Sequence, residues 1–548
     1  MLYFFSALEI YKMSSFLPPS ILNKATKVAF PHKMTIKQFE TVNRGDMTSS
    51  SNRSAKIEFD GIDYLNTAEG VLMYDLHSTS TYYINVDNSA YSPWQEISII
   101  SNTGETIDHI DNFNLLMNKL IEYRTSPGWT SSSATRFGCS LAPMKPTVVR
   151  STDIGWRNTT AIGVNGASGT GYKTLSIPIP IGLFSLPFIP FWKINGKITL
   201  QLKLADRQSG VIASNNDATW KVNNVRYVAQ CIDILDESTK AQITAEMSTP
   251  ERSNDVDGVE LSGAVCYEHF NAPVNSYMVN YKIMPSGISS MKALFCWFRD
   301  NTDISDITSR SVSKTVGSRV QYNATTYEVF NQFYLKNNGE YIPPHKISTL
   351  EDAMNHTIQA IGESVVDGSN MTHITAKNYM YDPASSGLTE GLISTYTADT
   401  AVLVANTAGV TDAYVAPIVY LSMASNATNA FTLSATRQTP DMRYIPIYAA
   451  DSSYSGYKFY TERDYPHVLS TFGIGIDLEA FQDSAQDHSI WSGTTPHNFE
   501  IYCDLSKNSA SAPWADSDGA THTLQCNLYI MYDATYIITP GGLVLKKS

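Results

Sequence analysis

Alternating apolar and polar residues recur along most of this chain and predict β-strands. In the run ITLQLKL at 198–204, four large aliphatic residues share one face, and the polar residues between them share the other. Side chains that alternate in this way fit a strand with one buried side. The same spacing recurs in segments of both halves, at 83–89, 94–110 and 220–236 and again at 289–299, 470–478, 498–505 and 522–532.

Two segments break this rhythm with apolar spacings of three and four, which predict short helices. The first is 111–123, DNFNLLMNKLIEY, where Asp111 is a candidate N-cap. The second is 350–362, LEDAMNHTIQAIG. Many short strands with turns every 8–12 residues favour sandwiches or barrels, and the length of the chain favours two units. The predicted fold is therefore all-β: two tandem eight-stranded jelly-roll β-sandwiches with short helices in the connections.

A proline-rich apolar segment at 177–192 interrupts the strands. Proline has no N–H for a strand ladder, so this segment is neither a central strand nor a helix interior. A long apolar connection needs a cover, so we expect it at a core or in a subunit contact. The residues expected to make this contact are Pro178, Pro180, Leu183, Phe184, Pro187, Phe188, Pro190 and Trp192.

Changes in composition suggest how the chain is divided. We expect an N-terminal arm at 1–50, a first jelly roll at 51–238, a polar and charged linker at 239–262 and a second jelly roll at 263–548. The Ala-, Ser- and Thr-rich region 380–435 is expected to form long exposed loops. The order of strands, helix, long connection and closing strands repeats between the halves, although their sequences do not.

Several of these segments resemble the double jelly-roll major capsid proteins of polinton-like viruses, virophages and their large DNA-virus relatives. The segment IPIPIGLFSLPFIPFWKINGKITLQLKL at 177–204 is the most specific. IISNTGETIDHIDNFNLLMNKLI at 99–121 is similar to that family's strand, turn and helix, with Phe113 in place of the commoner Tyr. FNQFYLKNNGEYIPPHKI at 330–347 resembles part of the second jelly roll, and LYIMYDATYIITPGGLV resembles the closing strands. Region 380–435 matches nothing in that family.

The resemblance implies a structural protein of the virion, assembled inside the host cell, in which homotrimers with a pseudo-hexagonal outline tile an icosahedral shell around a DNA genome. It implies no cofactor and no catalysis. The implied partners are neighbouring capsomers, penton and minor capsid proteins, and the host-cell surface through the outer loops. The arm would lie on the inner face and reach a neighbouring subunit, an internal membrane or the genome, through Phe4, Phe5, Lys12, Lys24 and Lys27.

Composition agrees with a role in assembly. Charged residues make up 17% of the chain and tyrosines number 32, which suits large subunit contacts. The net charge of −13 argues against a general nucleic-acid binder. The six cysteines form no C-x-x-C pair, so we expect free buried thiols in a reducing compartment. No apolar run reaches the roughly 18 residues of a membrane span, and the opening segment lacks the basic start of a signal peptide.

Signals for other chemistry are weak. In the glycine-rich stretch 166–174, Tyr172 separates the last glycine from Lys173, and no helical pattern follows, so a phosphate loop is not expected. His109 lies between acidic residues, but such turns are common without a metal. Asp477 and Glu479 alternate as paired carboxylates do, a coincidence expected among 52 acids.

The alternative to a capsid protein is a secreted tandem β-sandwich that binds carbohydrate or acts as an adhesin. The residues that would stack on sugars are Trp156, Trp192, Trp220 and Trp491, although tryptophans in sandwiches are usually packing residues. The missing signal peptide and the unpaired cysteines count against secretion. An adhesin would bind glycans as a monomer, whereas a capsid protein would form a stable trimer.

Overall fold

The structure is a computed structural model of the 548-residue chain. It describes residues 32–124, 172–241, 259–300, 318–361, 472–481, 498–507 and 523–547, apart from single positions and pairs within these ranges. It also describes Ile307, Tyr379 and the short strands at 420–423, 431–434, 442–448, 454–461 and 488–489.

The first half forms a sandwich of two antiparallel sheets. One sheet has the order β1-β11-β3-β7, and the other has the order β2-β9-β5-β6. Their bounds are β1 His32–Glu40, β11 Trp220–Ile234, β3 Tyr64–Ser78, β7 Tyr172–Ile177, β2 Ser54–Phe59, β9 Ile198–Leu204, β5 Trp94–Ile100 and β6 Thr106–Ile110. In β9 the four aliphatic residues are buried, as the alternation predicts.

The second half repeats this plan. Its sheets have the orders β12-β27-β14-β23 and β13-β26-β17-β18. Their bounds are β12 Val259–Ala272, β27 Leu524–Thr539, β14 Met291–Asp300, β23 Ile474–Asp477, β13 Met278–Ile283, β26 Phe499–Asp504, β17 Gln332–Asn337 and β18 Glu340–Ile347. The last strand, β28 Gly542–Lys547, pairs with β27.

The order of pairing identifies both sandwiches as jelly rolls. Counting the main strands of each half from one to eight, the first pairs with the eighth, the second with the seventh, the third with the sixth and the fourth with the fifth. This is the pattern of a long hairpin rolled into two facing sheets. The predicted fold class, two tandem eight-stranded jelly rolls, is therefore confirmed.

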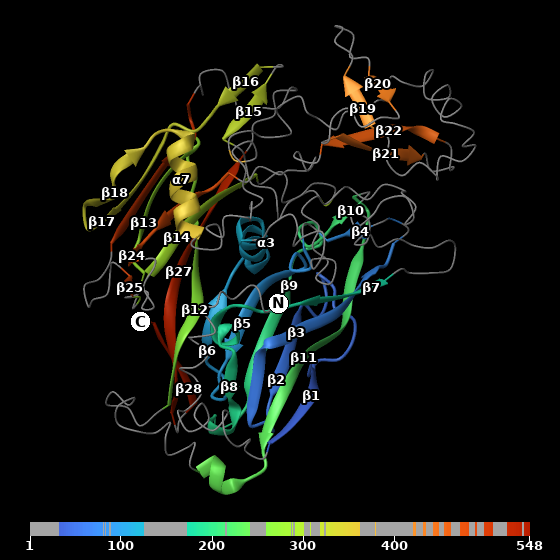
Figure 1. The fold of residues 1–548 in the computed structure, drawn as a ribbon, viewed down its shortest axis with the longest axis vertical. Helices are drawn as coiled ribbons and strands as arrows, with labels where there is room; N and C mark the ends of the chain where they lie inside the picture. Colours follow the sequence, from blue (N-terminus) through green and yellow to red (C-terminus); the bar gives the residue numbers. More distant parts are fainter. Residues whose placement is uncertain are drawn as a thin grey trace.

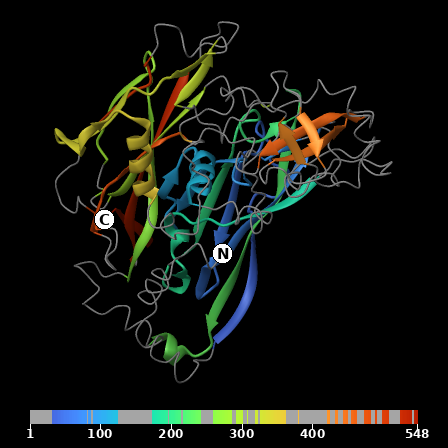
Figure 2. The same ribbon diagram turned by 45° about the horizontal axis from the view of Figure 1, so that its top comes forward.

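Two helices lie in equivalent places, each directly after the fifth strand of its jelly roll. They are α3 Phe113–Arg124 and α7 Leu350–Ile361, close to the predicted bounds. Helix α7 buries one face, as an amphipathic helix does. Helix α3 is buried on every side except at Arg124, because it lies between the two jelly rolls (Figures 1 and 2).

Short strands extend these sheets or form small hairpins. Strand β8 Phe188–Pro190 pairs with β3. The hairpins and pairs are β4 Ile84–Asn85 with β10 Ile212–Ala213, β15 Arg319–Tyr322 with β16 Thr325–Glu328, β19 Tyr420–Met423 with β20 Phe431–Ser434, β21 Met442–Tyr448 with β22 Tyr454–Thr461, and β24 Glu479–Phe481 with β25 His488–Ser489. Strands β19 and β20 fall in the region expected to form exposed loops, and the rest of 380–435 lies outside the described residues.

The N-terminal region differs from the expected arm in its last part. Residues 32–40 form β1, which pairs with β11 along its whole length and so belongs to the first sheet. The arm residues Phe4, Phe5, Lys12, Lys24 and Lys27 lie outside the described residues. Within the described part of the chain, no helix is long and apolar enough to cross a bilayer.

Candidate functional site

The proline-rich segment predicted as a contact site packs along the first jelly roll. It contains β8 and two 3-10 helices, η4 Gly182–Ser185 and η5 Phe191–Lys193. Leu183, Phe184 and Pro190 are buried, whereas Pro178, Pro180, Pro187, Phe188 and Trp192 are partly buried. Strand β8 continues the sheet edge that β7 occupies, because both pair with the same side of β3. An edge is where a sheet tolerates proline.

Aromatic packing and hydrogen bonds hold this segment to its own chain. The ring of Phe184 lies 5.4 Å from that of Phe59 and 5.5 Å from that of Tyr227. The Tyr91 hydroxyl donates to the Pro178 carbonyl at 2.7 Å. The middle of the segment therefore serves the core. A role in subunit contact stays a prediction for the partly buried Phe188 and Trp192.

The same segment also contacts the second jelly roll. The backbone N–H of Val265 in β12 donates to Ser185 Oγ at 2.9 Å. Gly182 has a φ of 57°, and a Cβ at this position would overlap the carboxylate of Asp108 and lie 3.2 Å from the Tyr536 hydroxyl. Helix η4 therefore fits closely between the first jelly roll and strands β12 and β27.

A buried carboxyl lies at the centre of this contact. Asp108 in β6 accepts a hydrogen bond from Tyr536 at 3.3 Å, and the Cys266 thiol lies 3.8 Å from the same oxygen. Burial raises the pKa of Asp108, while the positive charge of Lys547 opposes this shift. Burial also raises the pKa values of Cys266 and Tyr536. These groups form a small polar cluster between the jelly rolls, and burial favours the neutral form of each.

Replacing Gly182 with alanine is expected to lower the free energy of unfolding by about 2–4 kcal/mol, because the new methyl group meets the Asp108 carboxyl in a left-handed backbone conformation. Gly61→Ala is the matched control. Gly61 has a φ of 63°, but nothing lies within 4 Å of its added Cβ. Gly61→Ala should therefore lower the free energy of unfolding by only about 1–2 kcal/mol, because it meets the left-handed conformation alone. Urea denaturation measures the free energy of unfolding of both variants. Equal losses would contradict the close contact between Gly182 and Asp108.

Stability should also depend on the charge of Asp108. Its raised pKa means that the folded state keeps a proton that the unfolded chain releases above its ordinary value of 3.8. Stabilisation by the protonated carboxyl is full below that value and is lost as pH rises through the folded-state pKa. Asp108→Asn stays neutral, so the variant should become more stable relative to the wild type as pH rises above 3.8, where the unfolded wild-type carboxyl releases its proton. A difference that is constant with pH would contradict this assignment.

Helix α3 and Asn112, the residue before it, make the second contact between the jelly rolls. Trp297 Nε1 in β14 donates to the Tyr123 hydroxyl at 2.9 Å, and the Tyr529 hydroxyl in β27 donates to the Asn112 carbonyl at 3.0 Å. The Asn112 amide also donates to Asn527 Oδ1 at 3.2 Å. Residues more than 170 positions apart thus share hydrogen bonds that are buried or partly buried.

Helix α3 also contains a buried ion pair. Lys119 Nζ lies 2.7 Å from Glu122 Oε2, and their side chains are 0% and 4% exposed. Two charges without water need close pairing, because each costs several kcal/mol to desolvate. The pair explains how α3 can contain charged residues and still be buried from Phe113 to Tyr123.

The other candidates from the sequence form no catalytic arrangement among the described residues. Lys173 lies in strand β7, not at a helix start, and residues 166–171 lie outside the described part. Trp220 is buried, and its Nε1 donates to the Arg207 carbonyl at 3.0 Å, so it packs the core. Asp477 is the last residue of β23. The side chain of Glu479 lies outside the described part of the chain, and so do Trp156 and Trp491.

Five cysteines fall within the described residues, and all are free and buried. Their positions agree with the predicted free thiols, and Cys139 lies outside the described part. The thiols of Cys296 and Cys526 lie 3.5 Å apart in neighbouring strands of one sheet. Burial raises the pKa of Cys296, which keeps this thiol protonated and unreactive.

Two exposed faces carry apolar or aromatic side chains that the sequence did not single out. On β1, Met34 and Ile36 are 55% and 76% exposed. On the outer face of the second jelly roll, the rings of Tyr334 and Tyr502 stack at 4.9 Å, and Lys336 Nζ lies 4.9 Å from the centre of the Tyr334 ring. Such faces are typical of surfaces that a partner covers.

Two groups of side chains in the described residues have the composition of metal ligands. One is Glu96, His109 and Asp111 in the first jelly roll, and the other is His345, Asp352 and His356 in the second. His109 therefore does lie beside Asp111, at 3.4 Å, while Asp108 points away into the contact between the jelly rolls.

The fold and its contacts define a double jelly-roll protein whose two sandwiches are joined through a buried junction. No family model matches the sequence, and no curated protein matches it. Among solved structures, the chain is similar to that of the Sputnik virophage, with a TM-score of 0.49 and 9% identity over 94% of this chain and 89% of that chain. It is also similar to the PBCV-1 virus capsid, with a TM-score of 0.47 and 9% identity over 95% and 98%. The mavirus major capsid protein has a TM-score of 0.39 and 8% identity over 95% and 91%.

Proposed function

We propose that this chain is a major capsid protein that forms homotrimers, and that these trimers tile an icosahedral shell around a DNA genome. The proposed role is structural and needs no catalytic residue. The names of the similar structures agree with it, as do the sequence motifs shared with double jelly-roll capsid proteins.

The observation that carries this proposal is the repeated strand order within one chain. Each chain presents two modules of the same fold, held together by a buried junction. Three chains around an axis therefore supply six similar modules, and a ring of six has the near-hexagonal outline that tiles a surface. Closed rings of identical chains are the usual form of protein assemblies.

The remaining partners follow from this arrangement. Trimers would contact neighbouring capsomers, and penton and minor capsid proteins would fill the positions that trimers cannot. The arm at 1–31 would lie on the inner face against a neighbouring subunit, an internal membrane or the genome. Residues 380–435 would face the host-cell surface. The protein would then be found in the virion, after assembly inside the host cell.

The experiment is the solution mass of the purified chain by light scattering at low and moderate salt. The proposal expects three times the chain mass of 60.6 kDa, unchanged on dilution. Electron microscopy should then show particles with a hexagonal outline. A stable monomer would contradict the proposal and favour the secreted carbohydrate-binding alternative, for which a glycan-binding screen is the next measurement.

A further inference from the structure

We propose that His345, Asp352 and His356 form a binding site for one divalent transition-metal ion of the zinc type. The site lies in the second jelly roll and would connect strand β18 to helix α7. His345 comes from β18, and Asp352 and His356 come from successive turns of α7. The inference does not depend on the capsid proposal.

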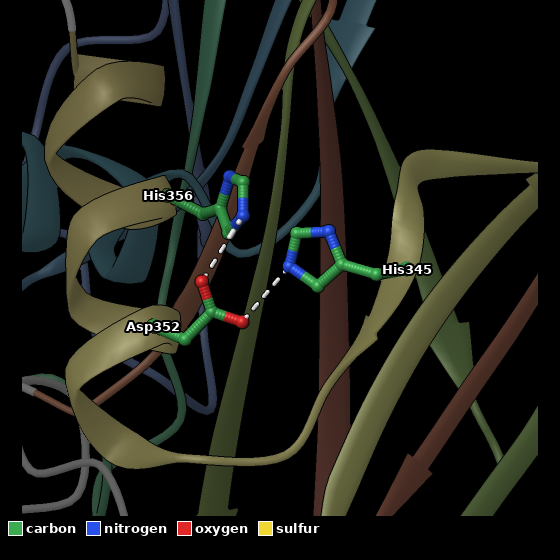
Figure 3. A group of neighbouring side chains, drawn as sticks. All are labelled: His345, Asp352 and His356. Carbon is green, nitrogen blue, oxygen red and sulfur yellow. Dashed lines mark hydrogen bonds and ion pairs between the residues drawn. The ribbon is translucent and has the colours of Figure 1, made fainter.

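The geometry of the three side chains fits a metal centre. Both imidazole Nε2 atoms face the Asp352 carboxylate, one toward each oxygen (Figure 3). His345 Nε2 lies 3.0 Å from Oδ2, and His356 Nε2 lies 3.4 Å from Oδ1. Ligand atoms about 2.0–2.1 Å from a tetrahedral zinc ion are about 3.3 Å from one another. The three groups already have nearly the spacing of a coordination sphere, and their ligand atoms all lie within 4.8 Å of one another.

The local fold explains why these groups converge. Thr349 Oγ1 accepts a hydrogen bond from the Asp352 backbone N–H at 3.2 Å, which fixes the first turn of α7. His356 follows Asp352 by four residues and so lies on the same helix face. A short connection returns the chain from β18 to the helix and places His345 beside both. The two imidazole centroids are 5.6 Å apart.

The donor set selects the class of ion. Two imidazoles and one carboxylate suit zinc and its transition-metal neighbours, whereas magnesium and calcium prefer oxygen ligands alone. The side chains of His345, Asp352 and His356 are 53%, 32% and 17% exposed, so the site is open on one side to a fourth ligand such as water.

The group in the first jelly roll provides a comparison within the same molecule. Glu96, His109 and Asp111 lie near the equivalent strand-to-helix connection. That group has only one imidazole, and His109 Nδ1 is 2.9 Å from Ser98 Oγ. It should therefore bind zinc more weakly than the group with two imidazoles.

The test is isothermal titration calorimetry of the EDTA-treated full chain with zinc chloride, with magnesium chloride as a second titrant. One strong equivalent of zinc is expected, with no comparable response to magnesium. His345→Ala and His356→Ala should each weaken zinc binding by about tenfold or more, a loss at least as large as that of an outer-shell partner. His109→Ala is the matched control and should leave the strong equivalent unchanged.

Two results would overturn the proposal: no stoichiometric zinc binding by the wild type, or equal zinc affinity in the wild type and His345→Ala. His345 is half exposed, so its replacement should not unfold the chain. Circular dichroism of each variant without metal checks this. Zinc should also raise the midpoint of thermal unfolding of the wild type more than that of His345→Ala, because stabilisation by a ligand grows with its affinity for the folded state.

Discussion

Replacing Trp297 with alanine is expected to lower the free energy of unfolding by about 3–5 kcal/mol, the cost of deleting a large buried aromatic side chain. Trp297 is fully buried in β14 and stacks on Phe295 with ring centroids 5.4 Å apart. It also contacts Tyr123 of helix α3 at 5.8 Å and Tyr529 of β27 at 5.3 Å. The change therefore removes packing from both jelly rolls at once, and it removes the hydrogen bond to Tyr123.

Trp94→Ala is the matched control for this prediction. Trp94 is equally buried, but its ring packs against Tyr74 within the first jelly roll, at 5.3 Å. Both variants should lose stability. Only Trp297→Ala should separate the unfolding of the two halves into two steps, because it weakens their contact. Calorimetry and circular dichroism measure this, and a single transition in Trp297→Ala at the wild-type midpoint would contradict the role given to the junction.

The second large effect is expected at the buried ion pair of α3. Either Glu122→Ala or Lys119→Met leaves one charge buried without its 2.7 Å partner. Each change should lower the free energy of unfolding by about 3–5 kcal/mol. The double variant Lys119→Met with Glu122→Leu removes both charges, and it should recover most of this loss, because apolar replacement of a buried pair is often neutral or stabilising.

An exposed ion pair supplies the control for this cycle. Arg44 Nη2 and Glu40 Oε2 are 2.8 Å apart, and their side chains are 82% and 58% exposed. Removing either partner should change the free energy of unfolding by less than about 1 kcal/mol. Two results would contradict a stabilising buried pair. The single α3 variants could lose no more free energy of unfolding than the surface variants, or the double variant could lose the sum of the two single losses.

Local patterns in the sequence were sufficient to predict both helices and about half of the main strands. The alternation over 198–204 and 220–236 corresponds to β9 and β11, and the three-and-four spacing over 111–123 and 350–362 corresponds to α3 and α7. These patterns are visible because each strand or helix buries one face against a single core. The winding of two jelly rolls was inferred from motif resemblance and strand number, and the pairing order confirms it.

Contacts between distant segments could not be predicted in the same way. Asp108 lies on the same side of β6 as the buried Ile110, and this alternation was a sequence signal that an acid is buried. Its partners Cys266 and Tyr536, however, lie in the other half of the chain. Asp352 and His356 are visibly paired on a predicted helix. The contribution of His345 depends on how the chain turns after β18, which no local pattern encodes. The assignment of residues 32–40 to an arm missed β1, because its outward residues include Met34 and Ile36 and obscure the alternation.

The junction at α3 also sets an order for synthesis. Tyr123 is made early, but its neighbours Trp297 and Tyr529 follow much later, and more than two hundred residues separate these two. A ribosome adding about 5–20 residues per second needs roughly ten to fifty seconds to cover that interval. Throughout this time the part of the junction that Tyr529 and β27 will cover stays exposed. A nascent chain with such a surface needs protection from aggregation until its last long strand, β27, leaves the ribosome.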